Sequence, residues 1–206
     1  MSVAQAIDPA VSRAKFEREV SEFQDLAADY GARGWFLAEA TFPTVLVVLA
    51  APHVKPPPVV TGVLLDYTDY DFRPPSVKLV DPFSRQPFRF EELPTQLLRQ
   101  VEAAGMAVPM FQLPPGVEAP KVMVNQPLMQ PDSTGEAPFL CIAGVREYHD
   151  HPGHSGDAWD LHRTAGAGRL VRILEVLDTY ALRPINGYNV QLVTQITGFA
   201  QSEVPA

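Results

Sequence analysis

The chain has 206 residues, a length that one hydrophobic core can organise. Its apolar fraction of 46% and charged fraction of 19% are ordinary for a globular protein and exclude a disordered tail. The formal net charge of -8, the pI near 5.0 and the lack of a cluster of Lys and Arg argue against nucleic acid as the main partner.

The cysteine count and the apolar runs indicate the compartment. A single cysteine allows no internal disulfide, and the N-terminal segment lacks the apolar core of a signal peptide. The longest uncharged apolar run, around residues 45–51, is far shorter than the ~18 residues that a membrane-spanning helix needs. We therefore expect a cytoplasmic protein without a membrane partner.

The first half of the chain predicts a helix followed by a sheet. Asp8 and Pro9 suit the cap and first turn of a helix, and apolar residues then recur at helical spacing until Gly31. From Trp35 onward, four β-type segments are broken by proline and aspartate: WFLAEATF, TVLVVLA, VVTGVLLDY and SVKLV. They predict an antiparallel meander of about four strands.

The second half contains a proline-rich insertion and a second helix. Many of the 21 prolines fall between residues 88 and 138, where we expect a short helix over 91–104 and no regular element afterwards. The stretch 168–182 predicts a helix that ends before Pro184 and has five residues on its apolar face: Leu170, Ile173, Leu174, Leu177 and Tyr180. Segment 189–200 suits a strand or a short helix. The fold class is α+β, a single domain over 1–206 with an N-terminal helix, a meander, an insertion at about 88–138, and a C-terminal helix packed on the sheet.

The candidate chemistry is concentrated in one segment, FLCIAGVREYHDHPGHSGDAWDLHR, which holds the only cysteine and four of the five histidines. If the chain is extended over 141–151, four potential ligands project from one face: Cys141, Glu147, His149 and His151. Such a mixture suits Zn²⁺, with His154 and His162 as further candidates. Same-face residues of a strand are roughly 6.6 Å apart, so Pro152 and Gly153 would have to bend the chain. Alternatively, the histidines lie on a solvated loop and Cys141 is a small core residue.

Several segments, taken in order, resemble those of the ubiquitin-conjugating enzymes and their bacterial relatives. After the first helix and the meander, TGVLLDYTDYDFRPPSVKLVDPF resembles that family's third and fourth strands, with Pro74 and Pro75 between them. FLCIAG resembles the entry to the active site, Trp159 stands where a tryptophan follows the cysteine, and GRLVRILEVLDTYALRPINGY resembles the helix beyond it. The arrangement of Cys141, Glu147 and the histidines also resembles a predicted Cys-Glu-His-His metal-binding family found beside bacterial ubiquitin-like genes.

The first resemblance implies thioester transfer without a required cofactor. An activating enzyme would pass a ubiquitin-like protein to the Cys141 thiolate, and an amine would then attack the thioester. His149 or His151 would be the base, and Asn125 would donate a hydrogen bond to the oxyanion.

Two alternatives share the same segment. Zn²⁺ would be held by Cys141, Glu147, His149 and either His151 or His154. A catalytically inactive scaffold would bind the ubiquitin-like protein or its activating enzyme without chemistry. Both chemical hypotheses require the sulfur of Cys141 to lie at an accessible surface beside imidazole groups.

Overall fold

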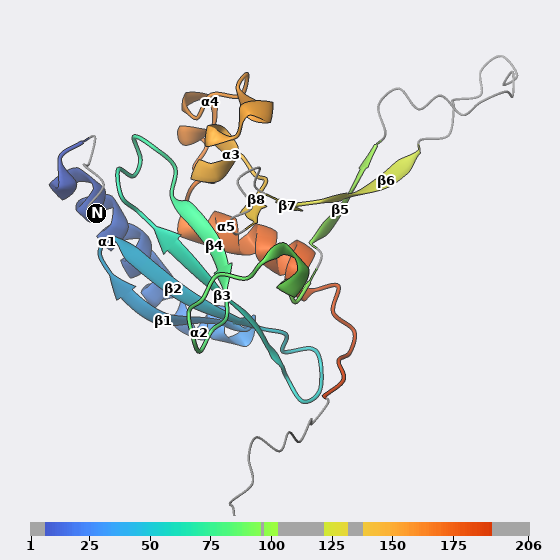
Figure 1. Cartoon of the computed structure of the whole chain (residues 1–206). Helices are drawn as coiled ribbons and strands as arrows, with labels where there is room; N and C mark the ends of the chain where they lie inside the picture. The colour runs from blue at the N-terminus through green and yellow to red at the C-terminus, as the bar shows by residue number, and fades with distance from the viewer. Residues whose placement is uncertain (1–6, 96, 103–121, 132–137, 191–206) are drawn as a thin grey trace, which may run out of the picture.

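The N-terminal helix forms where the sequence predicts it. A computed structural model describes residues 7–95, 97–102, 122–131 and 138–190 (Figure 1). In α1 (Pro9–Asp25) the Asp8 side chain accepts a hydrogen bond from the Ala10 amide at 2.9 Å, and Phe16, Val20 and Phe23 are buried. The short helix α2 (Ala27–Ala32) follows and leads the chain into the sheet.

The predicted meander is confirmed as a four-stranded antiparallel sheet in the order β1-β2-β3-β4. The strands are β1 (Trp35–Thr41), β2 (Thr44–Ala50), β3 (Val59–Asp66) and β4 (Ser76–Val80). On β2, Val47 lies opposite Leu37 on one side and Val63 on the other, so cross-strand pairs of apolar side chains hold the register. Pro74 and Pro75 are buried directly before β4.

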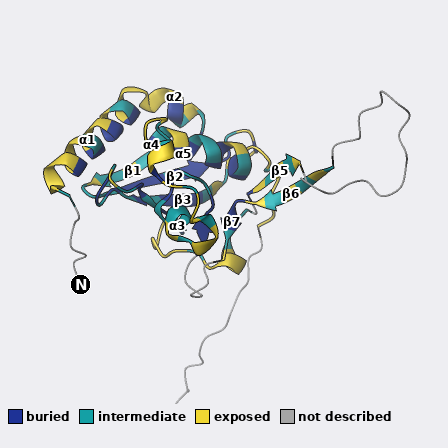
Figure 2. Ribbon diagram, turned by 90° about the horizontal axis from the view of Figure 1, so that it is seen from above, coloured by how far each residue is buried: buried dark blue, intermediate teal, exposed yellow. Residues whose placement is uncertain are grey.

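The second core helix is α5 (Leu170–Leu177), which continues through a wider turn, η3 (Asp178–Leu182), and ends before Pro184. Four of the five predicted apolar residues are fully buried, and the fifth, Tyr180, is half-buried: Leu170, Ile173, Leu174, Leu177 and Tyr180. They share one core with α1 and the sheet, and burial of each leucine contributes roughly 1.5–3 kcal/mol. The predicted α+β class is therefore confirmed, with both helices packed on the meander (Figure 2).

The expected helix over 91–104 is wrong. A single turn, η1 (Phe90–Glu92), is followed by strand β5 (Leu98–Glu102), which pairs antiparallel with β6 (Met123–Pro127). The pairing partner lies across the proline-rich segment, so local periodicity could not reveal it. In Figure 2 these two strands extend outward from the meander, and β5 contacts η3 at the end of α5.

A second small sheet leads to the cysteine. It consists of β7 (Met129–Gln130) and β8 (Phe139–Leu140). About half of the proline-rich insertion, and nearly all of segment 189–200, lie outside the described residues. In the described part of the chain, no helix has the length and apolar character needed to cross a membrane.

Candidate functional site

Cys141 directly follows β8 and is fixed by the small sheet. Its amide donates a hydrogen bond to the Leu128 carbonyl at 2.7 Å. The residue is only 6% exposed, so the expectation of a sulfur at an accessible surface is wrong, and attack by Cys141 would require the side chains that cover it to move aside. Burial raises the pKa of the Cys141 thiol, and the positive charge of Arg99 opposes this effect. The thiol is therefore the dominant form at neutral pH.

The chain beyond Cys141 is helical and not extended as expected. The amide of Arg146 donates to the Pro75 carbonyl at 2.9 Å, and helix α3 (Arg146–Asp150) begins there. A helix changes the side-chain period from 2 to 3.6, so the four predicted ligands no longer share one face. The buried Pro-Pro pair thus anchors the segment and sets its direction.

Gly144 permits the tight passage between Cys141 and α3. A Cβ atom on Gly144 would lie 2.0 Å from the backbone oxygen of Ala167. We expect Gly144→Ala to lower the free energy of unfolding by about 2–3 kcal/mol, because neither backbone can yield without repacking. Urea unfolding measures this, with Gly156→Ala as the matched control, since a Cβ there meets nothing within 4 Å. Equal unfolding midpoints for the two variants would contradict the prediction.

His154 is the histidine that contacts the sulfur. The turn η2 (Pro152–His154) brings its Nε2 atom to 3.4 Å from the Cys141 Sγ atom. The imidazole stacks on the Tyr148 ring, with 4.0 Å between the ring centroids. Burial lowers the pKa of His154, and the nearby His151 lowers it further. A neutral imidazole therefore faces a neutral thiol at pH 7, and the thiol can donate its proton to Nε2.

Asp157 supports this pair through Tyr148. The Tyr148 hydroxyl donates to Asp157 Oδ2 at 2.6 Å, and the other carboxylate oxygen lies 2.5 Å from His162 Nε2. His162 is carried by α4 (Asp160–Arg163), and the preceding Trp159 donates from its indole to the Asp71 carbonyl at 2.9 Å. Sequence reasoning did not assign Tyr148 a role, because no spacing shows which ring the turn at η2 will cover.

The Asp157 carboxylate gives a testable pH dependence. Hydrogen bonds from Tyr148 and then His162 hold the pKa of Asp157 below its ordinary value of 3.8. The folded state thus binds this proton less readily than the unfolded chain, and the stabilisation is present above that value and lost as the pH falls through the lowered pKa. We expect Asp157→Asn to reduce stability at pH 7, and the difference from the wild type to shrink below about pH 4. Urea unfolding at both pH values measures this; a difference independent of pH would contradict it.

The remaining predicted histidines have other contacts. Both ring nitrogens of His149 face carbonyl oxygens, Asp157 O at 2.8 Å from Nδ1 and Ala143 O at 2.6 Å from Nε2. His151 stacks on Phe139, with its ring centroid 5.6 Å from that of His154.

Glu147 and Asn125 also lie apart from the sulfur. Glu147 accepts hydrogen bonds from the Ser76 hydroxyl and, at 3.4 Å, from the Val77 amide. Asn125 is exposed on β6, opposite Gln100. Of the predicted site residues, the structure places His154 against Cys141 and His151 beside His154.

The predicted zinc ligands are not assembled in this arrangement. Among residues 7–95, 97–102, 122–131 and 138–190, no three His, Cys, Asp or Glu side chains are grouped so that they could hold a metal ion. Cys141 and His154 supply one sulfur and one nitrogen donor, and a tetrahedral shell needs four ligands. Zinc binding stays a prediction that requires Glu147 and His149 to exchange their present partners.

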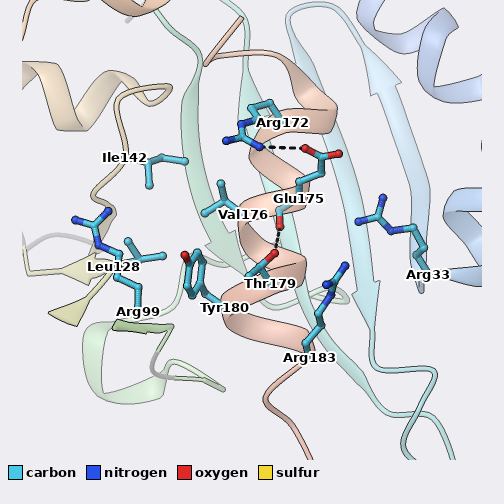
Figure 3. Close-up of a pocket in the computed structure, with 10 residues that line it drawn as sticks. All are labelled: Arg33, Arg99, Leu128, Ile142, Arg172, Glu175, Val176, Thr179, Tyr180 and Arg183. Atoms are coloured by element: carbon cyan, nitrogen blue, oxygen red, sulfur yellow. Dashed lines mark hydrogen bonds and ion pairs between the residues drawn. The ribbon is translucent and has the colours of Figure 1, made fainter. Parts of the chain in front are cut away.

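A pocket of about 420 Å³ is lined by residues of α5 and by two neighbours of Cys141 (Figure 3). Leu128 and Ile142, which flank the cysteine, are among its lining residues, and Arg99 of β5 borders it. Sequence reasoning missed this pocket, because its arginines are far apart in the chain and residue 99 lies in a segment expected to be helical.

The fold and site define an α+β protein with a thiol–imidazole pair formed by the residue after β8 and the turn η2. The chain belongs to the Y4jH family, described as Y4jH-like, which it matches over residues 7–185. It is 41% identical over 198 residues to a protein of Sinorhizobium fredii (strain NBRC 101917 / NGR234) that is titled "Uncharacterized protein y4jH". That match covers 96% of this chain and 95% of the relative.

Proposed function

We propose that the protein accepts the C-terminal acyl group of a ubiquitin-like protein as a thioester on Cys141 and transfers it to an amine, in a bacterial ubiquitin-like modification pathway. The observation that carries the proposal is the contact of 3.4 Å between the only thiol and the His154 imidazole. The order of elements, a helix, a four-stranded meander, the cysteine segment and a second helix, is the order implied by the resemblance to ubiquitin-conjugating enzymes.

The chemistry has two steps. In the first, the Cys141 thiol loses its proton to His154 Nε2 as the sulfur attacks the acyl carbon held by an activating enzyme, and His154 then passes this proton to the departing group, which leaves the imidazole neutral for the second step. In the second, an amine attacks the thioester carbonyl, an amide bond forms, and the amine's proton is returned to the Cys141 sulfur through His154. No oxidant, reductant or cofactor is consumed.

His154 takes the role of base in this proposal. His151, beside it, is the next candidate for proton transfer. His149 is less suited, because both of its ring nitrogens already face carbonyl oxygens. Asn125 would become an oxyanion donor only if β6 moved toward the cysteine, since its side chain is exposed in the present arrangement.

Zinc binding is the alternative that one observation favours. The sulfur of Cys141 and the ring of His154 are already in contact, and His151 lies next to them. A zinc-bound sulfur is a poor nucleophile, so the two functions compete for the same atom. An inactive scaffold that binds the same partners requires neither a nucleophilic sulfur nor a bound zinc ion.

The test is to incubate the wild-type protein with a ubiquitin-like protein, its activating enzyme and ATP, and to resolve the products with and without dithiothreitol. We expect an adduct that the thiol reagent cleaves. Elemental analysis of the same preparation separates the alternatives: about one equivalent of zinc without an adduct would replace the transfer function by the metal site. If the assay gives no adduct and the preparation contains no zinc, the result favours the inactive scaffold.

A further inference from the structure

The pocket beside Cys141 is strongly basic. Four guanidinium groups border it, drawn from the end of α2, from β5, from α5 and from the residue after η3: Arg33, Arg99, Arg172 and Arg183. The chain as a whole carries a net charge of -8. This concentration of positive charge is therefore a local property that composition does not predict.

Two of these arginines share one carboxylate. Arg33 and Arg183 both contact Asp178, at 3.2 and 2.8 Å, and Asp178 is almost fully buried. Arg33 also lies over the Trp35 ring, 3.7 Å from its centroid, which holds the side chain in place. One carboxylate thus neutralises only half of this pair.

The other two arginines have weaker partners. Arg172 contacts Glu175 at 3.3 Å in an ion pair on the exposed face of α5. Arg99 donates to the neutral amide oxygen of Gln126, at 3.1 and 2.8 Å. Among the residues that the structure describes, the four guanidinium groups contact two carboxylates, Asp178 and Glu175, which leaves a surplus of two positive charges.

The pocket adjoins the thiol through its two neighbours. Ile142 follows Cys141 in the chain, and the Leu128 carbonyl accepts the Cys141 amide at 2.7 Å. Both side chains line the pocket. An extended peptide advances about 3.5 Å per residue, so a chain whose last carbonyl reaches the sulfur can reach the pocket with the few residues before it.

We infer that this pocket binds an acidic peptide segment, with carboxylate side chains a few residues before the C-terminus of the protein whose acyl group Cys141 accepts. The identity of that segment rests on the proposed function. Carboxylates fit because guanidinium groups bind them through paired hydrogen bonds. A partner with a neutral or basic segment at these positions would bind to the pocket more weakly.

The arrangement of the arginines favours a peptide over a single compact anion. In Figure 3, Arg99 lies on one side of α5 and Arg33 and Arg183 lie on the other. The apolar side chains of Val176 and Ile142 lie among the lining residues. Such a surface suits carboxylates spaced along a chain with apolar atoms between them.

Binding is tested with the full-length protein and a fluorescein-labelled, C-terminally amidated peptide rich in glutamate, measured by fluorescence anisotropy at low salt. We expect Arg99→Gln combined with Arg172→Gln to weaken binding about tenfold or more, because charge-assisted hydrogen bonds are lost. Arg13→Gln combined with Arg85→Gln removes the same charge outside the pocket and should leave the affinity unchanged. The same peptide with glutamine in place of glutamate should bind at least tenfold more weakly.

Three outcomes would overturn the inference: equal binding of the two peptides, equal loss in the control variant, or displacement of the glutamate peptide by inorganic phosphate at far lower concentration than by free glutamate. Cys141→Ala should bind the peptide as the wild type does, so the two proposals fail separately. Peptide binding without an adduct would refute transfer on Cys141 alone. An adduct whose formation ignores the arginine pair would refute the pocket alone.

Discussion

Replacing Cys141 by alanine should abolish every thiol-cleavable adduct with a ubiquitin-like protein. The chain has a single cysteine, so no other side chain can form a thioester. The measurement is the adduct assay with and without dithiothreitol, together with circular dichroism to show that the variant folds. Cys141→Ser serves as a second variant because it nearly preserves the side-chain volume, and it too should give no thiol-cleavable product.

An adduct that persists in Cys141→Ala and is still cleaved by dithiothreitol would contradict the assignment of the nucleophile. The wild type and the variant should also differ in reaction with iodoacetamide, since the wild type alone offers a thiol. Because Cys141 is a buried residue, only 6% exposed, we expect native alkylation to be slower than alkylation of the urea-unfolded chain. This comparison measures access to the sulfur independently of any partner.

The regular part of the fold was predictable from local patterns. Four β-type segments between prolines and aspartates became β1 to β4, and Leu170, Ile173 and Leu174 are buried as their helical spacing indicates. The strand β5 was not predictable, because its partner β6 lies across the proline-rich segment. The periodicity of a segment indicates which of its own side chains are buried. Strand pairing depends on a second segment that can be distant in the sequence.

The location of the site was predictable but its geometry was not. The concentration of histidines around Cys141 pointed to the segment in which His154 contacts the sulfur, yet the parity argument that joined Cys141 to Glu147 and His149 assumed an extended chain. The helix α3 turns Glu147 toward Ser76, and the turn η2 brings His154 to the sulfur. Both depend on the anchoring of Arg146 on Pro75, a tertiary contact.

The arginines of the pocket carry no local signal at all. Residues 33, 99, 172 and 183 lie in or directly after four different elements, and only the packed fold brings them to one pocket. Composition suggested the opposite, because the net charge is negative. The net charge of a whole chain is therefore weak evidence against an anionic partner. The distribution of charge over the folded surface is stronger evidence.

His154→Asn should slow the first acyl transfer to Cys141 by roughly 100-fold, the usual contribution of a positioned base. The wild-type rate should fall as the pH drops through the pKa of His154, which lies below the ordinary 6.5, because the protonated ring cannot accept the thiol proton. The variant should lack this dependence and regain activity only as the pH approaches the raised pKa of the thiol. Single-turnover rates between pH 5 and about 10 would show both effects, since the thiol pKa lies above its ordinary value of 9.0.

The matched control for this prediction is His53→Asn, an imidazole whose Nε2 lies 2.7 Å from the Ile185 carbonyl, outside the site. It should keep the wild-type rate and pH profile. If His154→Asn also keeps them, the contact of 3.4 Å between sulfur and imidazole has no catalytic role, and the ring serves packing against Tyr148 or a metal shell. Because only a base would produce the paired change in rate and pH profile, the experiment distinguishes proton transfer from a purely structural contribution of the same side chain.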